Sequence, residues 1–246
     1  MKKDVIVILG PTAVGKSALG VELAKKLNGE IVSADATQVY RGLDIGSAKV
    51  SKKEMCGIKH HLIDILDFTE KFNAFMFVNL AKRLIDDIIS RGKTPIIVGG
   101  TNLYISALIN NYTFEKAGIS EEVYQNKFPL KYHLFALNFD DREELYQRIN
   151  LRVENMLKNG LVGEVKVLRG KGLNVNLQAG KGIGYRELLL WLDGLMTYEE
   201  AVEKICQHSR NFAKRQLTWL RSMKNLVWLE ALDSSNAQKV IDFVKK

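Results

Sequence analysis

The stretch that decides the fold is the octapeptide Gly10-Pro11-Thr12-Ala13-Val14-Gly15-Lys16-Ser17. It fits the pattern of a phosphate-binding loop, in which two glycines let the backbone curl so that successive N–H groups point at one anion. Lys16 supplies a positive charge for a terminal phosphate, and the hydroxyl of Ser17 is suited to bind Mg²⁺. The octapeptide therefore predicts a phosphate site, without saying which phosphate compound binds there.

The segments on either side of the octapeptide supply the strand and the helix that such a loop needs. Residues 5–9 form a short apolar run rich in β-branched side chains, which is typical of a buried strand. Residues 18–27 carry apolar side chains at helical spacing and end at Asn28-Gly29, a pattern that stops helices. The helix is expected to direct the positive end of its dipole at the same anion.

The rest of the chain continues the alternation of strands and helices. Further strands are predicted at 30–34, 60–65, 94–98, 132–139 and 227–229, and helices at 73–91, from 102, at 140–156, 161–168, 185–191 and 198–224, and at the C-terminal end. This order predicts a single α/β domain over 1–246, with a P-loop-type doubly wound parallel sheet flanked by helices. The interval 110–131 loses the periodicity and is predicted to be a connection or a small helical excursion, and the C-terminal part is predicted to be helical.

Two polar stretches follow predicted strands and are expected near the phosphate loop. Asp35 comes directly after the strand at 30–34, and Gly99-Gly100-Thr101 comes after the strand at 94–98. In parallel sheets of this kind, ligands bind beyond the carboxyl ends of the strands. Asp35 is as readily explained as a loop acid, and the glycine pair as a tight turn, so position alone leaves their roles open.

Composition narrows the class of protein and of partner. The 246 residues are 46% hydrophobic and 26% charged, which is ordinary globular usage, and the net charge is +8. A basic balance favours nucleic acid, acidic membranes or phosphate-rich ligands. The two cysteines form no framework, which fits a reducing cytoplasmic environment, and no run is long enough to span a membrane. The predicted helix 198–224 carries Arg210, Lys214 and Arg221 within about 40° of one another, either as a solvated face or as a phosphate-facing stripe.

Several stretches together resemble one family, the tRNA dimethylallyltransferases, also called tRNA isopentenyltransferases. The resemblance covers nearly the whole chain in family order. The matching pieces are the octapeptide at 10–17, Ser33-Ala34-Asp35, the segment 38–46 (QVYRGLDIG), His60-His61-Leu62-Ile63-Asp64, Val98-Gly99-Gly100-Thr101 with Leu103-Tyr104, the segment 181–185 (KGIGY) and the segment 213–219 (AKRQLTW).

The resemblance implies transfer of a dimethylallyl group from dimethylallyl diphosphate to N6 of adenosine 37, beside the tRNA anticodon. It implies that Asp35 is the general base and that Thr101 helps to hold the amine. The phosphate loop, Lys16, Mg²⁺ on Ser17, and Arg215 would stabilise the leaving diphosphate, so the expected ligand is a prenyl diphosphate despite the ATP-binding label usual for such loops. The residues expected to contact the anticodon stem-loop are Asp35, Ala36, Thr37, Gln38, Thr101, Arg210 and Lys214. A monomer is expected.

One departure from the family pattern lies in the middle of the chain. Members carry a helical insertion of several dozen residues that grips the anticodon stem, and here only 110–131 stands in its place. We therefore expect the chemistry to survive and the grip on RNA to be weaker.

Three other functions remain open at this stage. Related adenylate isopentenyltransferases act on free nucleotides and lack the insertion. A small-molecule or nucleotide kinase would need an arginine-rich lid, for which the sequence offers no convincing candidate. A non-catalytic RNA-binding protein would not need Asp35, Thr101, Lys16 and Arg215 together.

Overall fold

The computed structural model describes residues 2–114 and 123–245, and their strands form a six-stranded sheet in the order β3-β2-β4-β1-β5-β6. Every neighbouring pair in this sheet is parallel. The strands are β1 (Lys3–Leu9), β2 (Gly29–Ala34), β3 (His60–His61), β4 (Thr94–Gly99), β5 (Leu130–Asn138) and β6 (Leu226–Glu230). The predicted doubly wound parallel sheet is confirmed.

Helices cover both faces of the sheet, because alternate residues of the central strand β1 point to opposite sides. Val5 and Val7 pack into the core shared with α3 (Ala74–Ser90) and α4 (Asn102–Ile109). Ile6 and Ile8 pack into a second core with residues of four helices, which are α1 (Lys16–Lys26), α5 (Arg142–Lys158), α8 (Tyr198–Ser222) and α9 (Asn236–Val244). Burial on both faces explains why β1 reads as a continuous apolar run.

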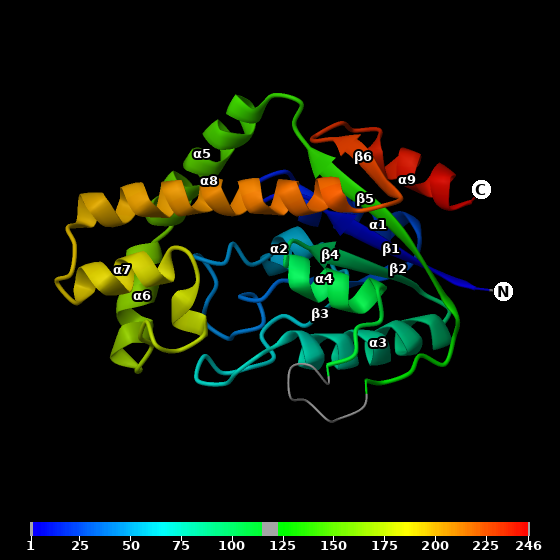
Figure 1. Ribbon diagram of the computed structural model, residues 1–246, viewed down its shortest axis with the longest axis horizontal. Helices are drawn as coiled ribbons and strands as arrows, with labels where there is room; N and C mark the ends of the chain where they lie inside the picture. The colour runs from blue at the N-terminus through cyan, green and yellow to red at the C-terminus, as the bar shows by residue number, and fades with distance from the viewer. Residues whose placement is uncertain (1, 115–122, 246) are drawn as a thin grey trace.

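The remaining helices extend beyond the carboxyl ends of the strands. Figure 1 shows α6 and α7 past the edge of the sheet and the long α8 running back alongside it toward β6. Their bounds are Leu161–Gly170 for α6, Tyr185–Leu192 for α7 and Tyr198–Ser222 for α8, with short turns at α2 (Lys52–Met55) and η2 (Ala179–Lys181). No helix among the described residues is long and apolar enough to cross a membrane.

The structure shortens one predicted strand and describes only part of the predicted excursion at 110–131. The strand predicted over 60–65 is wrong beyond His61, because Leu62 and Asp64 take left-handed φ values of 61° and 55° that end the extended chain. The shortened excursion at 110–131 falls partly on 115–122, outside the described residues, and stays a prediction. Its C-terminal side is fastened to α3, where Asn79 Oδ1 accepts a 2.7 Å bond from the backbone N–H of Tyr124.

Candidate active site

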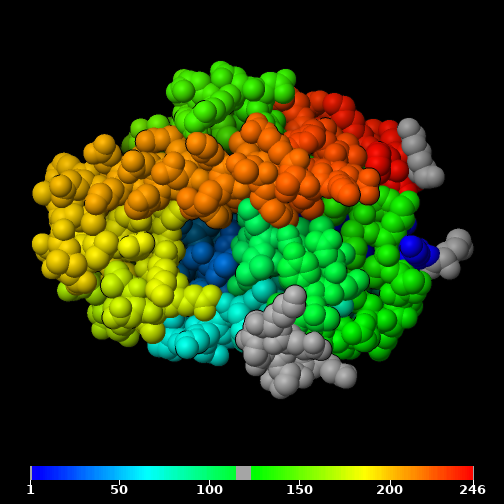
Figure 2. Space-filling model, in the orientation of Figure 1, coloured from blue at the N-terminus to red at the C-terminus, as the bar shows by residue number. Residues whose placement is uncertain are grey.

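A cavity of about 750 Å³ opens beyond the carboxyl ends of the strands, where the sequence predicted a ligand site. Its wall is formed by the phosphate loop, the segments that follow β2 and β4, and facing side chains of α5 and α8. Figure 2 shows the surface hollowed between α8 and α4, with N-terminal residues, coloured blue, at the bottom of the hollow. The volume is typical of a small-molecule site.

The phosphate loop occupies one side of the cavity. Gly15 has a left-handed φ of 88° and precedes the first residue of α1, so the loop turns sharply into the helix. Thr12, Ala13, Gly15, Lys16 and Ser17 line the cavity. The backbone N–H groups at the start of α1 and its dipole make this wall attractive to an anion.

Lys16 shares this wall with a second cation, Arg152 of α5. Burial and, to a smaller extent, the positive charge of Arg152 lower the pKa of Lys16, and Asp35 opposes both effects, which together leave the pKa at about 7. Burial also lowers the pKa of Arg152, again opposed by Asp35. Two cations held close together at a cost in free energy form a site that a multiply charged anion would stabilise.

Asp35 lies on the same cavity wall and is held by the backbone that follows it. Its Oδ1 accepts bonds from the N–H of Thr37 at 2.8 Å and from the N–H of Gln38 at 3.2 Å. Among the described residues, no hydrogen bond reaches Oδ2. The carboxylate is therefore fixed through one oxygen, while the other can accept a proton.

Thr101 stands beside Asp35 because β2 and β4 are neighbours in the sheet. Its Oγ1 accepts a 3.1 Å bond from the backbone N–H of Ala36, and its own N–H donates to the carbonyl oxygen of Ala34 at 3.2 Å. These two bonds lock the loop after β4 to the loop after β2. The hydroxyl keeps its proton for a further partner.

Gln216 joins the two loops from α8. Its Oε1 accepts a 3.1 Å bond from the N–H of Thr12, and its Nε2 donates a 2.8 Å bond to the carbonyl oxygen of Gly100. The side chain is almost fully buried. One amide thus ties the phosphate loop to the loop that carries Thr101.

The structure brings most of the predicted site residues to this one cavity. Besides the loop residues above, the predicted residues on its wall are Asp35, Ala36, Thr37, Gln38, Thr101 and Arg215. Gly10, Pro11 and Val14 are buried beneath the loop and shape it from below. Arg210 and Lys214 lie on α8 outside the cavity wall, and Arg210 donates a 2.7 Å bond to Asn150 Oδ1. Their role in RNA binding stays a prediction.

Sequence reasoning missed Arg152 and Gln216. Arg152 falls within the apolar stripe of α5, between Ile149 and Met156, and all three line the cavity. A charged residue on the buried face of a helix was the pattern that could have revealed it. Gln216 lies within the segment 213–219, but nothing in the sequence indicates which loops its amide joins.

The site fits the Mg²⁺ that Ser17 was predicted to bind. Mg²⁺ usually keeps several waters and takes only one or two protein ligands together with the phosphates of the substrate. Ser17, the last residue of the phosphate loop, lies on the cavity wall. Within 2–114 and 123–245 no group of three or more His, Cys, Asp or Glu side chains could hold a metal alone, so a diphosphate would have to supply most ligands.

Comparisons with known proteins agree with one another. The family model described as IPP transferase matches residues 38–128 and 113–223. A tRNA dimethylallyltransferase of Oceanobacillus iheyensis is 39% identical over 302 aligned positions, which cover 99% of this chain and 96% of the relative. The crystal structure of the full-length tRNA isopentenylpyrophosphate transferase of Bacillus halodurans superposes with a TM-score of 0.88 at 36% identity, covering 99% of this chain and 96% of that one.

A eukaryotic dimethylallyltransferase acting on tRNA is also similar, with a TM-score of 0.85 at 27% identity over 99% of this chain and 80% of that one. The model match spans well over half of the chain, and the bacterial relative matches it nearly end to end. The chain therefore belongs to the IPP transferase family.

Proposed function

We propose that this protein transfers a dimethylallyl group from dimethylallyl diphosphate to N6 of adenosine 37 in tRNA. The observation that carries the proposal is the meeting of an anion site, a fixed carboxylate and a fixed hydroxyl in one cavity. The relative from Oceanobacillus iheyensis, named tRNA dimethylallyltransferase, supports the choice of donor and acceptor.

The donor's diphosphate lies against the phosphate loop in this proposal. Backbone N–H groups of the loop, Lys16 and Arg152 surround it, and Arg215 reaches it from α8. As the bond between C1 of the prenyl group and the diphosphate oxygen breaks, its electron pair stays on the diphosphate. Cations and N–H groups already in place stabilise that developing charge. Mg²⁺, held by Ser17 and the diphosphate, would add positive charge to the same oxygens.

The acceptor amine needs to lose a proton as it attacks. N6 forms a bond to C1 of the prenyl group, and the proton passes to Oδ2 of Asp35. The hydrogen bonds from Thr37 and Gln38 to Oδ1 hold the carboxylate in a single orientation for this transfer. Thr101, fixed by Ala36, offers its hydroxyl to the adenine. Such positioned proton transfer contributes about a hundredfold to ten-thousandfold to a rate.

The adenine has to leave its stack in the anticodon loop to reach this depth. Unstacked bases of RNA loops are the usual targets of sequence-specific recognition. The wall of the cavity on the acceptor side is formed by the segment after β2, residues 35–38. The cavity is thus shared, with the phosphate loop serving the donor and the segment after β2 serving the acceptor.

A paired transfer assay tests this proposal against its rivals. Purified protein, Mg²⁺ and labelled dimethylallyl diphosphate are incubated with bulk tRNA or with AMP, and N6-modified adenosine is identified by mass. We expect label in tRNA. Label in AMP alone would assign the protein to the adenylate isopentenyltransferases. Label in neither, with tRNA still bound, would favour a non-catalytic RNA-binding protein, and phosphate transfer from ATP would favour a kinase.

A further inference from the structure

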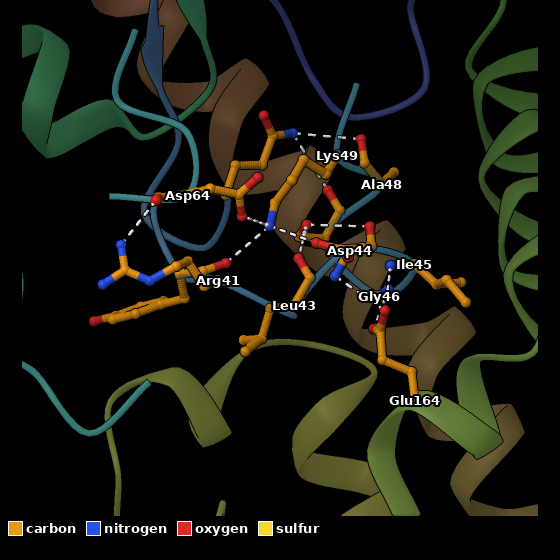
Figure 3. Close-up of polar contacts among 12 residues, drawn as sticks. Arg41, Leu43, Asp44, Ile45, Gly46, Ala48, Lys49, Asp64 and Glu164 are labelled. Atoms are coloured by element: carbon orange, nitrogen blue, oxygen red, sulfur yellow. Dashed lines mark hydrogen bonds and ion pairs between the residues drawn. The ribbon is translucent and has the colours of Figure 1, made fainter. Parts of the chain in front are cut away.

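The loop on the acceptor side of the cavity has almost no regular structure of its own. Residues 36–50 run mainly through turns, yet Gln38, Gly46, Ser47, Ala48 and Val50 all line the cavity. A loop of this kind keeps one shape only if side chains from elsewhere hold its backbone. Figure 3 shows two sets of polar contacts that do so, one centred on Glu164 and one on Lys49.

Glu164 of α6 binds three successive backbone N–H groups of this loop. Its Oε2 accepts from Asp44 at 3.0 Å and from Ile45 at 2.8 Å, and its Oε1 accepts from Gly46 at 3.1 Å. These residues are nearly 120 positions away in sequence from Glu164. Hydrogen bonds to a charged acceptor are about twice as strong as neutral ones. One carboxylate therefore fixes the curvature of the loop at 44–46.

Tyr185, the first residue of α7, completes this contact. Its hydroxyl donates a 2.7 Å bond to Oε1 of Glu164, and burial followed by the charge of Glu164 raises the pKa of Tyr185, so it remains a donor. Gly46 rests directly on the Tyr185 ring, where a Cβ would come within 2.6 Å of ring carbons. Tyr185 thus holds both the carboxylate and the loop.

Lys49 holds the same loop from the other side. Its side chain is only 6% exposed and pairs with Asp44 at 2.6 Å and with Asp64 at 2.5 Å. Its Nζ also donates to the carbonyl oxygen of Tyr40 at 2.8 Å. Asp44 is therefore held through its backbone by Glu164 and through its side chain by Lys49.

The held segment leads directly to the residues that face the acceptor. Nε2 of Gln38 rests at 3.4 Å from the carbonyl oxygens of Ser47 and Ala48, which follow the segment bound by Glu164. The N–H of Gln38 in turn donates to Oδ1 of Asp35. A continuous set of contacts connects Glu164 with the carboxylate, and none of them involves the phosphate loop.

We propose that Glu164, together with Tyr185, is a positioning residue that sets the acceptor side of the active site and leaves the diphosphate side unaffected. This inference rests on the proposed function, because it assigns the loop at 36–48 to the adenine of tRNA. Glu164 is not among the residues that line the cavity. Its loss lets the loop relax, so that Gln38 and Asp35 meet the adenine in more than one arrangement.

Steady-state kinetics of Glu164→Ala test the proposal. We expect the KM for tRNA to rise about tenfold and kcat to fall, because several charge-assisted bonds that order the loop are lost. The dissociation constant for pyrophosphate with Mg²⁺, measured by calorimetry, stays at the wild-type value. Tyr185→Phe removes only the hydroxyl and gives a smaller change in the same direction, and Glu164→Gln restores part of the activity because it keeps one acceptor oxygen.

The matched control is Arg169→Ala, also on α6, which loses a surface ion pair with Asp193 and should behave as wild type. An unchanged KM for tRNA in folded Glu164→Ala, or an equal weakening of pyrophosphate binding, would overturn the proposal. If Glu164→Ala does not fold, Tyr185→Phe and Glu164→Gln carry the same comparison. A wild-type protein that modifies no tRNA would contradict the proposed function instead, and binding of an anticodon stem-loop by these variants would still test the role of Glu164.

Discussion

The side-chain amide of Gln216 lies 2.8 Å from the carbonyl oxygen of Gly100 and donates a hydrogen bond to it. A Cβ on Gly100 would come within 2.3 Å of that same Nε2, while its next neighbours are 3.5 Å away. The glycine is therefore required by one contact, and that contact ties the loop of Thr101 to α8. Replacing Gly100 tests how much the alignment of the phosphate loop with the loop of Thr101 depends on the Gln216 side chain that joins them.

Gly100→Ala is expected to expel the amide of Gln216 and to lower both activity and stability. Gln216→Ala should lower the free energy of unfolding by about 1–3 kcal/mol, since it leaves the N–H of Thr12 and the carbonyl of Gly100 without their partner. The double variant should cost less than the sum of the two, because the clash and the bridge involve the same atoms. Denaturant unfolding of the four proteins measures this, and strictly additive costs would contradict it.

Arg152→Met is expected to weaken the binding of pyrophosphate with Mg²⁺ about tenfold to a hundredfold. The cation lines the cavity beside Lys16, and a hydrogen bond to a charged partner is worth about 1.5–3 kcal/mol. Arg142→Met is the matched control, because Arg142 lies on the same helix but is exposed and contacts Tyr146. Calorimetric titration of both variants decides the matter. Equal affinities for the two variants would remove Arg152 from the anion site.

The wild-type protein should lose affinity for a diphosphate, relative to the permanently charged variant Lys16→Arg, as the pH rises above 7. The Lys16 pKa is lowered to about 7, so the side chain is charged below that pH and increasingly neutral above it. A bound anion raises this pKa, so binding above pH 7 takes up a proton. We expect the ratio of wild-type to Lys16→Arg affinity to fall by up to about tenfold per pH unit, since arginine stays protonated. When Arg152→Met is introduced, this affinity ratio should begin to fall at a higher pH, because the charge of Arg152 no longer lowers the pKa of Lys16. An affinity ratio that does not change with pH would refute this account.

The sequence predicted the parallel sheet and the octapeptide site because both depend on local patterns. β1 alternates its side chains between two cores and is bounded by the octapeptide, so its class and place could be inferred from residues 5–17 alone. Gln216 and Glu164 could not be predicted, because each binds residues that lie far away in sequence, such as Thr12 and Asp44. Arg152 was missed although it interrupts the apolar stripe of α5. The strand predicted after His61 was wrong because the side chains there favour a strand. Leu62 and Asp64 instead adopt left-handed conformations that no local pattern indicates.

Asp35→Asn should lower kcat for prenyl transfer about a hundredfold to ten-thousandfold. The amide oxygen of asparagine can still accept the N–H groups of Thr37 and Gln38, so the turn is preserved. What is lost is the group that accepts the proton from N6. Single-turnover assays with prebound donor isolate this step. Activity within tenfold of wild type would mean that another group takes the proton.

The affinity for tRNA should be lower than that of the Bacillus halodurans relative, and it should depend less steeply on salt. The alignment with the Oceanobacillus iheyensis protein spans 302 positions, whereas this chain has only 246 residues to fill them. The family model matches in two pieces that overlap at 113–128. We expect the missing positions near the connection at 110–131, as the resemblance implies. The resemblance to the tRNA dimethylallyltransferases implies that this region supplies basic contacts to the anticodon stem in longer family members.

Each phosphate contact that is lost reduces the slope of log K against log salt concentration by about 0.7–0.9. A chain that lacks several such contacts should therefore bind tRNA more weakly at low salt and lose less affinity as salt is added. Filter binding of one tRNA to both proteins over a range of salt concentrations measures the two slopes. Equal slopes would mean that exposed cations elsewhere, such as Lys214 and Arg221 on α8, replace the missing contacts. In that case Lys214→Ala should make the slope shallower by the amount of about one phosphate contact, roughly 0.7–0.9, since each contact contributes separately to counterion release.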